Sequence, residues 1–167
     1  MLVGALVLLL SCGGEDDGGD DAPTVKTGVP TEMSEQQLRA FGRAQAVPVY
    51  WAGPQENRRY ELTRTAGGRV YIRYLTPKAD VGSAQPRFLT VGTYPGRDAY
   101  SALRKASQGA GSVRVRTQSG ALVTWSKARP QSVYFAFPDS AFQVEVYDPS
   151  AMRARSLVLD GQVSRLG

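Results

Sequence analysis

The sequence predicts an α+β domain, in which a mainly antiparallel sheet of about seven strands built from hairpins carries two or three packed helices. Three observations favour this fold class. Short runs rich in β-branched and aromatic residues recur along the chain and are separated by turns rich in Gly, Pro and Asp. Other stretches have helical spacing and begin at capping residues. Hydrophobic residues make up 42% of the 167-residue chain, which is enough to form the core of one domain.

The first predicted helix covers residues 34–45. Ser34 and Gln37 fit a capping box, in which each side chain accepts a hydrogen bond from the backbone of the other residue. Leu38 and Phe41 follow at helical spacing and give the helix one apolar face. We therefore expect this helix to pack on the domain.

The predicted strands come mostly in hairpins. Their turns contain Gly67-Gly68, Gln118-Ser119-Gly120 and Pro138-Asp139-Ser140. In the last hairpin, Val133, Phe135 and Phe137 alternate with Tyr134 and Ala136, and Phe142, Val144 and Val146 alternate with Gln143, Glu145 and Tyr147. One face is therefore expected to be core and the other wetter. Residues 162–166 fit a short final strand. The other predicted strands are 47–53, 60–65, 69–75, 88–94, 112–117, 121–126, 132–137 and 142–147.

A second helix is predicted at residues 99–107. Asp98 is expected to cap its N-terminus, and Gly109 is expected to end it. Ala99 and Leu103 share one face of this helix, so that face is expected to pack on the sheet.

The last helix is predicted to start at Asp148-Pro149, with Asp at the cap and Pro at the first helical position. Met152 and Leu157 are among the apolar residues expected to face the core. Gly161 is expected to end the helix.

Residues 1–12 are typical of a bacterial lipoprotein signal. An apolar run is too short to span a bilayer, which needs about 20 residues, but it matches the hydrophobic part of a secretory signal. Leu9-Leu10-Ser11-Cys12 resembles a lipobox, so Cys12 is the predicted site of lipid attachment. An ordinary secretory signal is the alternative. A lipid on Cys12 would hold the protein to the outer face of the cell membrane, because two or more acyl chains anchor stably.

Residues 13–30 are predicted to be a disordered linker, and residues 31–167 a single domain. The linker is rich in Gly, Asp, Pro and Thr and contains almost nothing that could be buried. Its acidic residues repel one another and favour an extended chain. This composition suits a tether that holds the domain away from a membrane.

The charge balance and the missing histidine limit the chemistry. From Ala46 onward there are 17 Lys and Arg against 8 Asp and Glu, a formal +9, which favours anionic partners or simply gives a soluble surface. The chain has no His, which excludes Ser-His-Asp and Cys-His catalysis and His-containing zinc sites. With one Cys there is no internal disulfide. We expect no cofactor, no metal and no catalytic residue.

Arginine and tyrosine residues form the candidate ligand-binding set. Arg73, Arg114 and Arg116 occupy strand positions from which they could form a basic strip. Tyr71 and Tyr134 belong to an aromatic set that could line a groove beside it, a combination suited to an anionic envelope ligand. The alternative is that the aromatic residues are packing and the arginines are a solvated face. Export and the lack of an RNA-binding motif argue against nucleic acid.

Paired carboxylates are the enzymatic alternative. A glycosidase needs two carboxylates facing each other across a cleft, about 5–9.5 Å apart. Glu61 and Glu145 lie on predicted strands and could form such a pair. Asp98 and Asp148 are expected to cap helices instead.

Several segments together resemble a family of exported actinobacterial proteins. They are PVYWAGP (48–54), YELT (60–63), VYIRYL (70–75), LTVGTYP (89–95), SVYFAFP (132–138) and QVEVYDP (143–149). The resemblance implies export and a shared fold, and brings no activity or catalytic residue. The sequence therefore predicts a lipid-anchored, extracytoplasmic, non-enzymatic binding or interaction module at the cell envelope. An envelope hydrolase with paired carboxylates is the alternative, and a purely structural envelope protein is a third.

Overall fold

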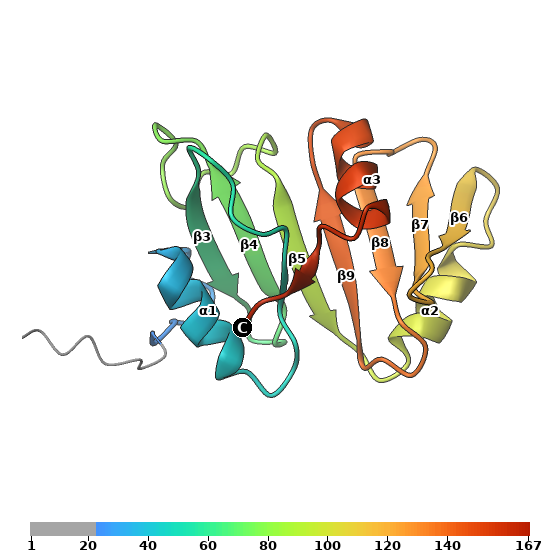
Figure 1. Ribbon diagram of the computed structural model, residues 1–167, viewed down its shortest axis with the longest axis horizontal. Helices are drawn as coiled ribbons and strands as arrows, with labels where there is room; N and C mark the ends of the chain where they lie inside the picture. Colours follow the sequence, from blue (N-terminus) through green and yellow to red (C-terminus); the bar gives the residue numbers. More distant parts are fainter. Residues whose placement is uncertain (1–22) are drawn as a thin grey trace, which may run out of the picture.

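The computed structural model describes residues 23–167 (Figure 1). The predicted signal with Cys12 and the first part of the predicted linker lie outside the described residues. The domain is α+β, with a mainly antiparallel sheet and three helices in the described part, which confirms the predicted fold class. No helix within residues 23–167 is long and apolar enough to cross a membrane.

The main sheet has eight antiparallel strands in the order β1-β3-β4-β5-β9-β8-β7-β6. The chain runs through β3, β4 and β5, moves to the far edge at β6, and returns through β7 and β8 to place β9 beside β5 (Figure 1). The strands are β1 (Thr31–Met33), β3 (Arg59–Arg64), β4 (Val70–Leu75), β5 (Thr90–Pro95), β6 (Ser112–Arg116), β7 (Leu122–Ser126), β8 (Ser132–Ala136) and β9 (Phe142–Tyr147).

Seven of these strands match predicted ones, and β1 is additional. The predicted strand at residues 47–53 does not join the main sheet. Only Tyr50–Trp51 is a strand, β2, and it pairs with β10 (Ser164–Arg165) in a separate two-stranded ribbon. Tyr50 and Trp51 are buried in the main core, so this ribbon is held by aromatic packing and lies against β5.

The core lies on one face of the sheet. Alternate strand residues on that face, such as Leu62, Ile72 and Val144, are fully buried at 0% exposure. Helix α1 (Glu35–Arg43), helix α3 (Ala151–Leu159) and the β2–β10 ribbon cover this face, and Figure 1 shows α3 lying along β8 and β9. Burying each such side chain contributes about 1.5–3 kcal/mol.

The opposite face is covered only in part. Helix α2 (Ala99–Ala106) places Leu103 against Leu122 and Ala136, which point away from the main core. Tyr134 packs against the same cluster. Helix α2 contacts β7, β8 and β9, and within residues 23–167 no helix covers the other half of this face, over β3, β4 and β5.

The helix N-termini show which capping predictions were right. Ser34 and Gln37 form the predicted capping box: the Gln37 N–H donates to Ser34 Oγ at 3.2 Å, and the Ser34 N–H donates to Gln37 Oε1 at 2.9 Å. Asp98 precedes α2 as predicted, but its side chain makes no capping hydrogen bond.

The predicted start of the last helix was wrong. Its N-cap is Ser150, whose Oγ accepts from the Arg153 N–H at 3.4 Å. Asp148 is buried and accepts the Ser150 N–H at 2.8 Å, so it forms the turn before the helix. Met152 is 72% exposed and does not face the core, because the buried stripe of the helix is Ala154, Leu157 and Val158 and Met152 lies outside it.

Residues 23–30, at the end of the predicted linker, run along the domain. Val25 packs against the core, and the Gly28 N–H donates to the Arg64 carbonyl at 2.7 Å. Gly28 has a positive φ of 78°, a conformation that costs glycine little. The chain therefore reaches the edge of the sheet before β1 begins.

Candidate functional site

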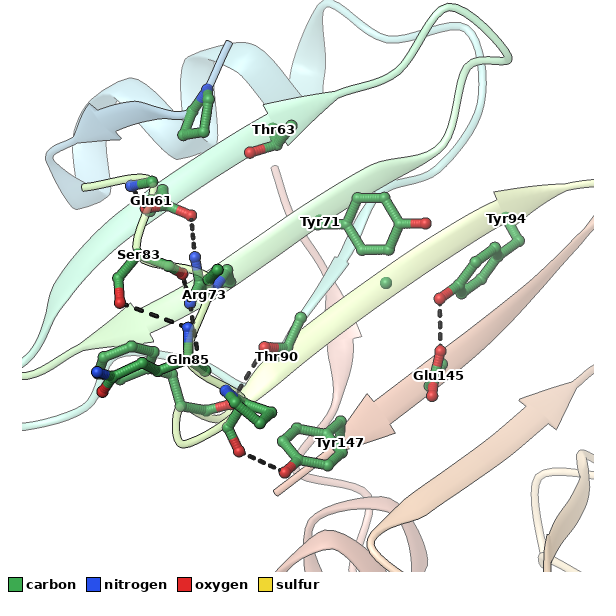
Figure 2. Close-up of a pocket in the computed structure, with 16 residues that line it drawn as sticks. Glu61, Thr63, Tyr71, Arg73, Ser83, Gln85, Thr90, Tyr94, Glu145 and Tyr147 are labelled. Atoms are coloured by element: carbon green, nitrogen blue, oxygen red, sulfur yellow. Dashed lines mark hydrogen bonds and ion pairs between the residues drawn. The ribbon is translucent and has the colours of Figure 1, made fainter. Parts of the chain in front are cut away.

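The half of the sheet face without a helix holds a groove of about 410 Å³ (Figure 2). Strands β3, β4, β5 and β9 form its floor, and the loop at residues 76–89 between β4 and β5 forms one wall. Its lining residues are Pro30, Glu61, Thr63, Tyr71, Arg73, Gly82, Ser83, Ala84, Gln85, Pro86, Phe88, Thr90, Gly92, Tyr94, Glu145 and Tyr147.

Strand register brings the polar residues of this floor together. Successive side chains of a strand point to opposite faces, so residues that are opposite one another across the sheet share a face. The first cross-strand row is Glu61, Arg73, Thr90 and Tyr147, and the second is Thr63, Tyr71, Gly92 and Glu145. Four strands thus supply side chains to one small area.

A buried ion pair closes one end of the groove. Arg73 Nη1 donates to Glu61 Oε1 at 2.9 Å, and the Glu61 side chain is only 1% exposed. The Gly82 N–H donates to the other Glu61 oxygen at 2.6 Å. Arg73 Nη2 donates to the carbonyls of Ser83 and Gln85, at 2.7 and 3.4 Å. The pair therefore connects the 76–89 loop to the sheet. Its two charges neutralise each other, so neither is available to a ligand.

Other contacts fix the same loop. Tyr147 donates its hydroxyl hydrogen to the Pro86 carbonyl at 2.5 Å. Leu75, Ala79 and Phe88 form a small buried cluster beneath the loop. The Arg73 guanidinium lies 5.1 Å from the ring centre of Phe88. These contacts hold this wall of the groove against the sheet.

Glu145 lies at the other side of the groove and accepts two phenol hydrogen bonds. Tyr94 donates to its Oε2 at 2.5 Å, and Tyr134 donates to its Oε1 at 2.9 Å. Burial raises the pKa of both tyrosines, and the neighbouring Glu145 carboxylate raises it further. Both phenols therefore stay protonated at neutral pH and act as donors.

Two aromatic rings stand beside this carboxylate. Tyr71 and Tyr94 meet edge to face, with ring centres 5.7 Å apart, and Figure 2 shows Tyr71 across the groove from Glu145. The Arg69 guanidinium lies 5.6 Å from the ring centre of Tyr94. Gly92 lets Tyr94 lie low over β5, because a Cβ at Gly92 would come within 2.9 Å of Tyr94 Cε2.

Gly92→Ala should displace the Tyr94 ring and break its hydrogen bond to Glu145 while the domain stays folded. The ring tip is the group that must move, and losing a hydrogen bond to a charged group costs about 1.5–3 kcal/mol. We expect a lower urea midpoint, and NMR should show a changed Tyr94 ring environment. Gly96→Ala is the matched control, because a Cβ there has nothing within 4 Å. An unmoved Tyr94 ring in the Gly92 variant would contradict this account.

The structure places all five predicted ligand-binding residues on this face but does not bring them all together. Tyr71 and Arg73 line the groove. Tyr134 does not line it, but its hydroxyl donates to Glu145, which does. Arg114 and Arg116 lie on β6, five strands away from β4, about 24 Å at the usual strand spacing. The three arginines therefore form no continuous basic strip.

The two candidate carboxylates line the same groove without forming a catalytic pair. Glu61 and Glu145 lie on strands three places apart, about 14 Å at the usual spacing. Both oxygens of Glu61 are bonded to Arg73 and Gly82. In residues 23–167 there is also no cluster of three or more acidic, Cys or His side chains that could hold a metal ion.

Sequence reasoning missed the 76–89 loop, Gly92 and Tyr147 as parts of the site. The loop has no periodic pattern that would predict its position. The alternation in the last hairpin did place Glu145 and Tyr147 on the wetter face, and this was the signal available for both.

Comparisons of the chain with protein-family models, with curated proteins and with solved structures found no match, so the resemblance to exported actinobacterial proteins stays a prediction.

Proposed function

We propose that the protein is a non-enzymatic binding module of the cell envelope, held at the outer face of the membrane by a lipid on Cys12, and that it takes a small organic ligand into the groove. The observation that carries this proposal is the groove itself. Its volume of about 410 Å³ lies in the range of small-molecule sites. Its wall is mainly apolar, and its few polar groups converge from four strands.

The fixed geometry of the groove supports binding. The Glu61–Arg73 pair and the Tyr147–Pro86 hydrogen bond hold the loop, and two phenols orient Glu145. A preformed site loses little conformational entropy when a ligand enters. This rigidity favours a binding site over a surface with only a structural role.

The chemistry of the groove supports binding over hydrolysis. Glu145 is the one lining carboxylate without a cationic partner, since Glu61 is paired with Arg73. The sequence has no His to act as a general base. Tyr94 is a poor nucleophile because its raised pKa keeps the phenol protonated.

Three small probes of one shape test the groove. Choline, 3,3-dimethyl-1-butanol and 3,3-dimethylbutanoate have similar branched skeletons with a positive, zero and negative charge. We expect at least one of them to bind the purified full chain at millimolar concentration and to shift the NMR signals of groove residues such as Thr90 and Tyr71.

A variant that fills the groove provides the control. Thr90→Trp projects a large ring into the groove and should remove this binding. Thr24→Trp makes the same change at an exposed position outside the groove and its wall, and should preserve the binding. Binding that survives in a folded Thr90→Trp variant, or no binding of any probe to the unmodified chain, would overturn the proposed site.

A further inference from the structure

We propose that the ligand of this groove carries an organic cation, an ammonium group with apolar substituents, which lies against the Glu145 carboxylate and the ring of Tyr71. This inference rests on the proposed function, because it names the class of ligand for the same groove. It concerns charge, and it can fail while the groove remains a binding site.

The charge balance of the lining favours a cation. The acidic and basic side chains among the lining residues are Glu61, Arg73 and Glu145. Glu61 and Arg73 neutralise each other at 2.9 Å, which leaves Glu145 with its negative charge and only neutral phenol donors. The lining residues that the structure describes therefore carry a net formal charge of −1, within a chain whose overall formal charge is +5. The guanidiniums of Arg69 and Arg87 lie outside this lining, against the rings of Tyr94 and Phe88.

Glu145 still has acceptor capacity. A carboxylate offers about four lone-pair positions, and the hydroxyls of Tyr94 and Tyr134 occupy two of them. These donors fix the direction of the carboxylate without cancelling its charge. A half-buried carboxylate with a fixed direction interacts with a cation more strongly than one in bulk water.

The aromatic lining suits the same ligand class. A cation within about 6 Å of a ring centre is attracted by the ring quadrupole, and apolar substituents on nitrogen gain from contact with the rings. Arg69 already lies against Tyr94 in this way, at 5.6 Å. Tyr71 and Tyr147 also line the groove, and Figure 2 shows Glu145 between Tyr147 and Tyr94 with Tyr71 opposite.

Among the lining residues that the structure describes, an anion would find no cation without a carboxylate partner. It would meet the charge of Glu145, and the Arg73 guanidinium already donates to Glu61, Ser83 and Gln85. The basic side chains of Arg114 and Arg116 lie on the far edge strand. The basic composition of the chain favours an anionic ligand, whereas the lining of this groove favours a cationic one.

The three probes test separately whether the groove binds a ligand and whether that ligand is a cation. Choline should bind at least tenfold more tightly than its neutral isostere 3,3-dimethyl-1-butanol, and 3,3-dimethylbutanoate should bind most weakly. Equal affinities for choline and the isostere, with binding lost in Thr90→Trp, would overturn the cationic ligand and leave the groove as a binding site. No binding of any probe would overturn both.

Glu145→Gln removes the charge and keeps the shape. In this variant choline affinity should fall about tenfold, to that of the neutral isostere, whose own affinity should stay unchanged. Glu56→Gln is the matched control, because Glu56 is exposed and outside the groove, so it removes the same charge elsewhere. Full choline affinity in a folded Glu145→Gln variant would overturn the proposal.

Tyr71→Leu gives an independent test if the Glu145 variant fails to fold. Removing the ring should weaken choline at least threefold more than it weakens the neutral isostere, because only the cation gains from the ring quadrupole. Equal weakening of both probes would remove the aromatic part of the proposal.

Discussion

Arg73→Ala should destabilise the domain by about 3–5 kcal/mol, the usual cost of removing one partner of a buried ion pair. Glu61 is 1% exposed, so the variant would leave its carboxylate buried beside only one remaining donor, the Gly82 N–H. The Ser83 and Gln85 carbonyls would lose their donor as well. Urea unfolding at pH 7, followed by tryptophan fluorescence, measures the change.

Two further variants show whether the ion pair is the cause. Arg114→Ala removes an exposed arginine from the same face and should change stability by no more than about 0.5 kcal/mol. The double variant Glu61→Leu, Arg73→Met removes both charges and should recover much of the loss, since apolar replacement of a buried pair is often neutral. An Arg73→Ala loss below 1 kcal/mol would show that the pair does not hold the loop.

Cys12→Ala should move the protein from the membrane fraction to the aqueous fraction of a bacterial host. A diacylglycerol on this sulfur would supply at least two acyl chains, and each buried CH2 contributes about 0.8 kcal/mol to membrane binding. The shift should therefore be close to complete. Fractionation with immunoblotting measures the shift. Mass spectrometry of the wild-type protein should show the added mass of the lipid.

The neighbouring residue gives a control. Ser11→Ala keeps a small residue before the cysteine and should leave the protein in the membrane fraction. If the Cys12→Ala protein stays in the membrane fraction, Cys12 is not the residue that anchors the protein, and the lipoprotein prediction is wrong.

The fold was largely predictable because most of its strands show a regular apolar pattern and are separated by turns rich in Gly, Pro and Asp. Apolar residues alternate clearly in β8 and β9, and the Ser34–Gln37 capping box is a strong local signal. Strand β1 has only three residues, too few to show a period. The start of α3 was misplaced because Asp148 and Ser150 both suit a cap; in the structure Ser150 accepts the Arg153 N–H, and Asp148 accepts the Ser150 N–H in the preceding turn.

The site was predictable in part. Tyr71 and Arg73 alternate on one strand, so their shared face follows from the sequence. The pairing of Glu61 with Arg73 follows from the hairpin centred on Gly67, which places the two residues opposite each other. The pairing of β5 with β9 could not be predicted, because residues such as Tyr94 and Glu145 are 51 positions apart and no local signal sets their register.

The pairing of β5 with β9 also affects how the protein acquires its binding site. It joins two consecutive strand meanders, and Tyr71 comes from the first while Glu145 comes from the second. Contacts so distant in sequence form late and slowly, since a long loop must close before they gain any energy. Ligand binding would therefore report that both halves of the chain have docked. A ligand spanning this seam would also oppose its opening, because it binds only the docked form.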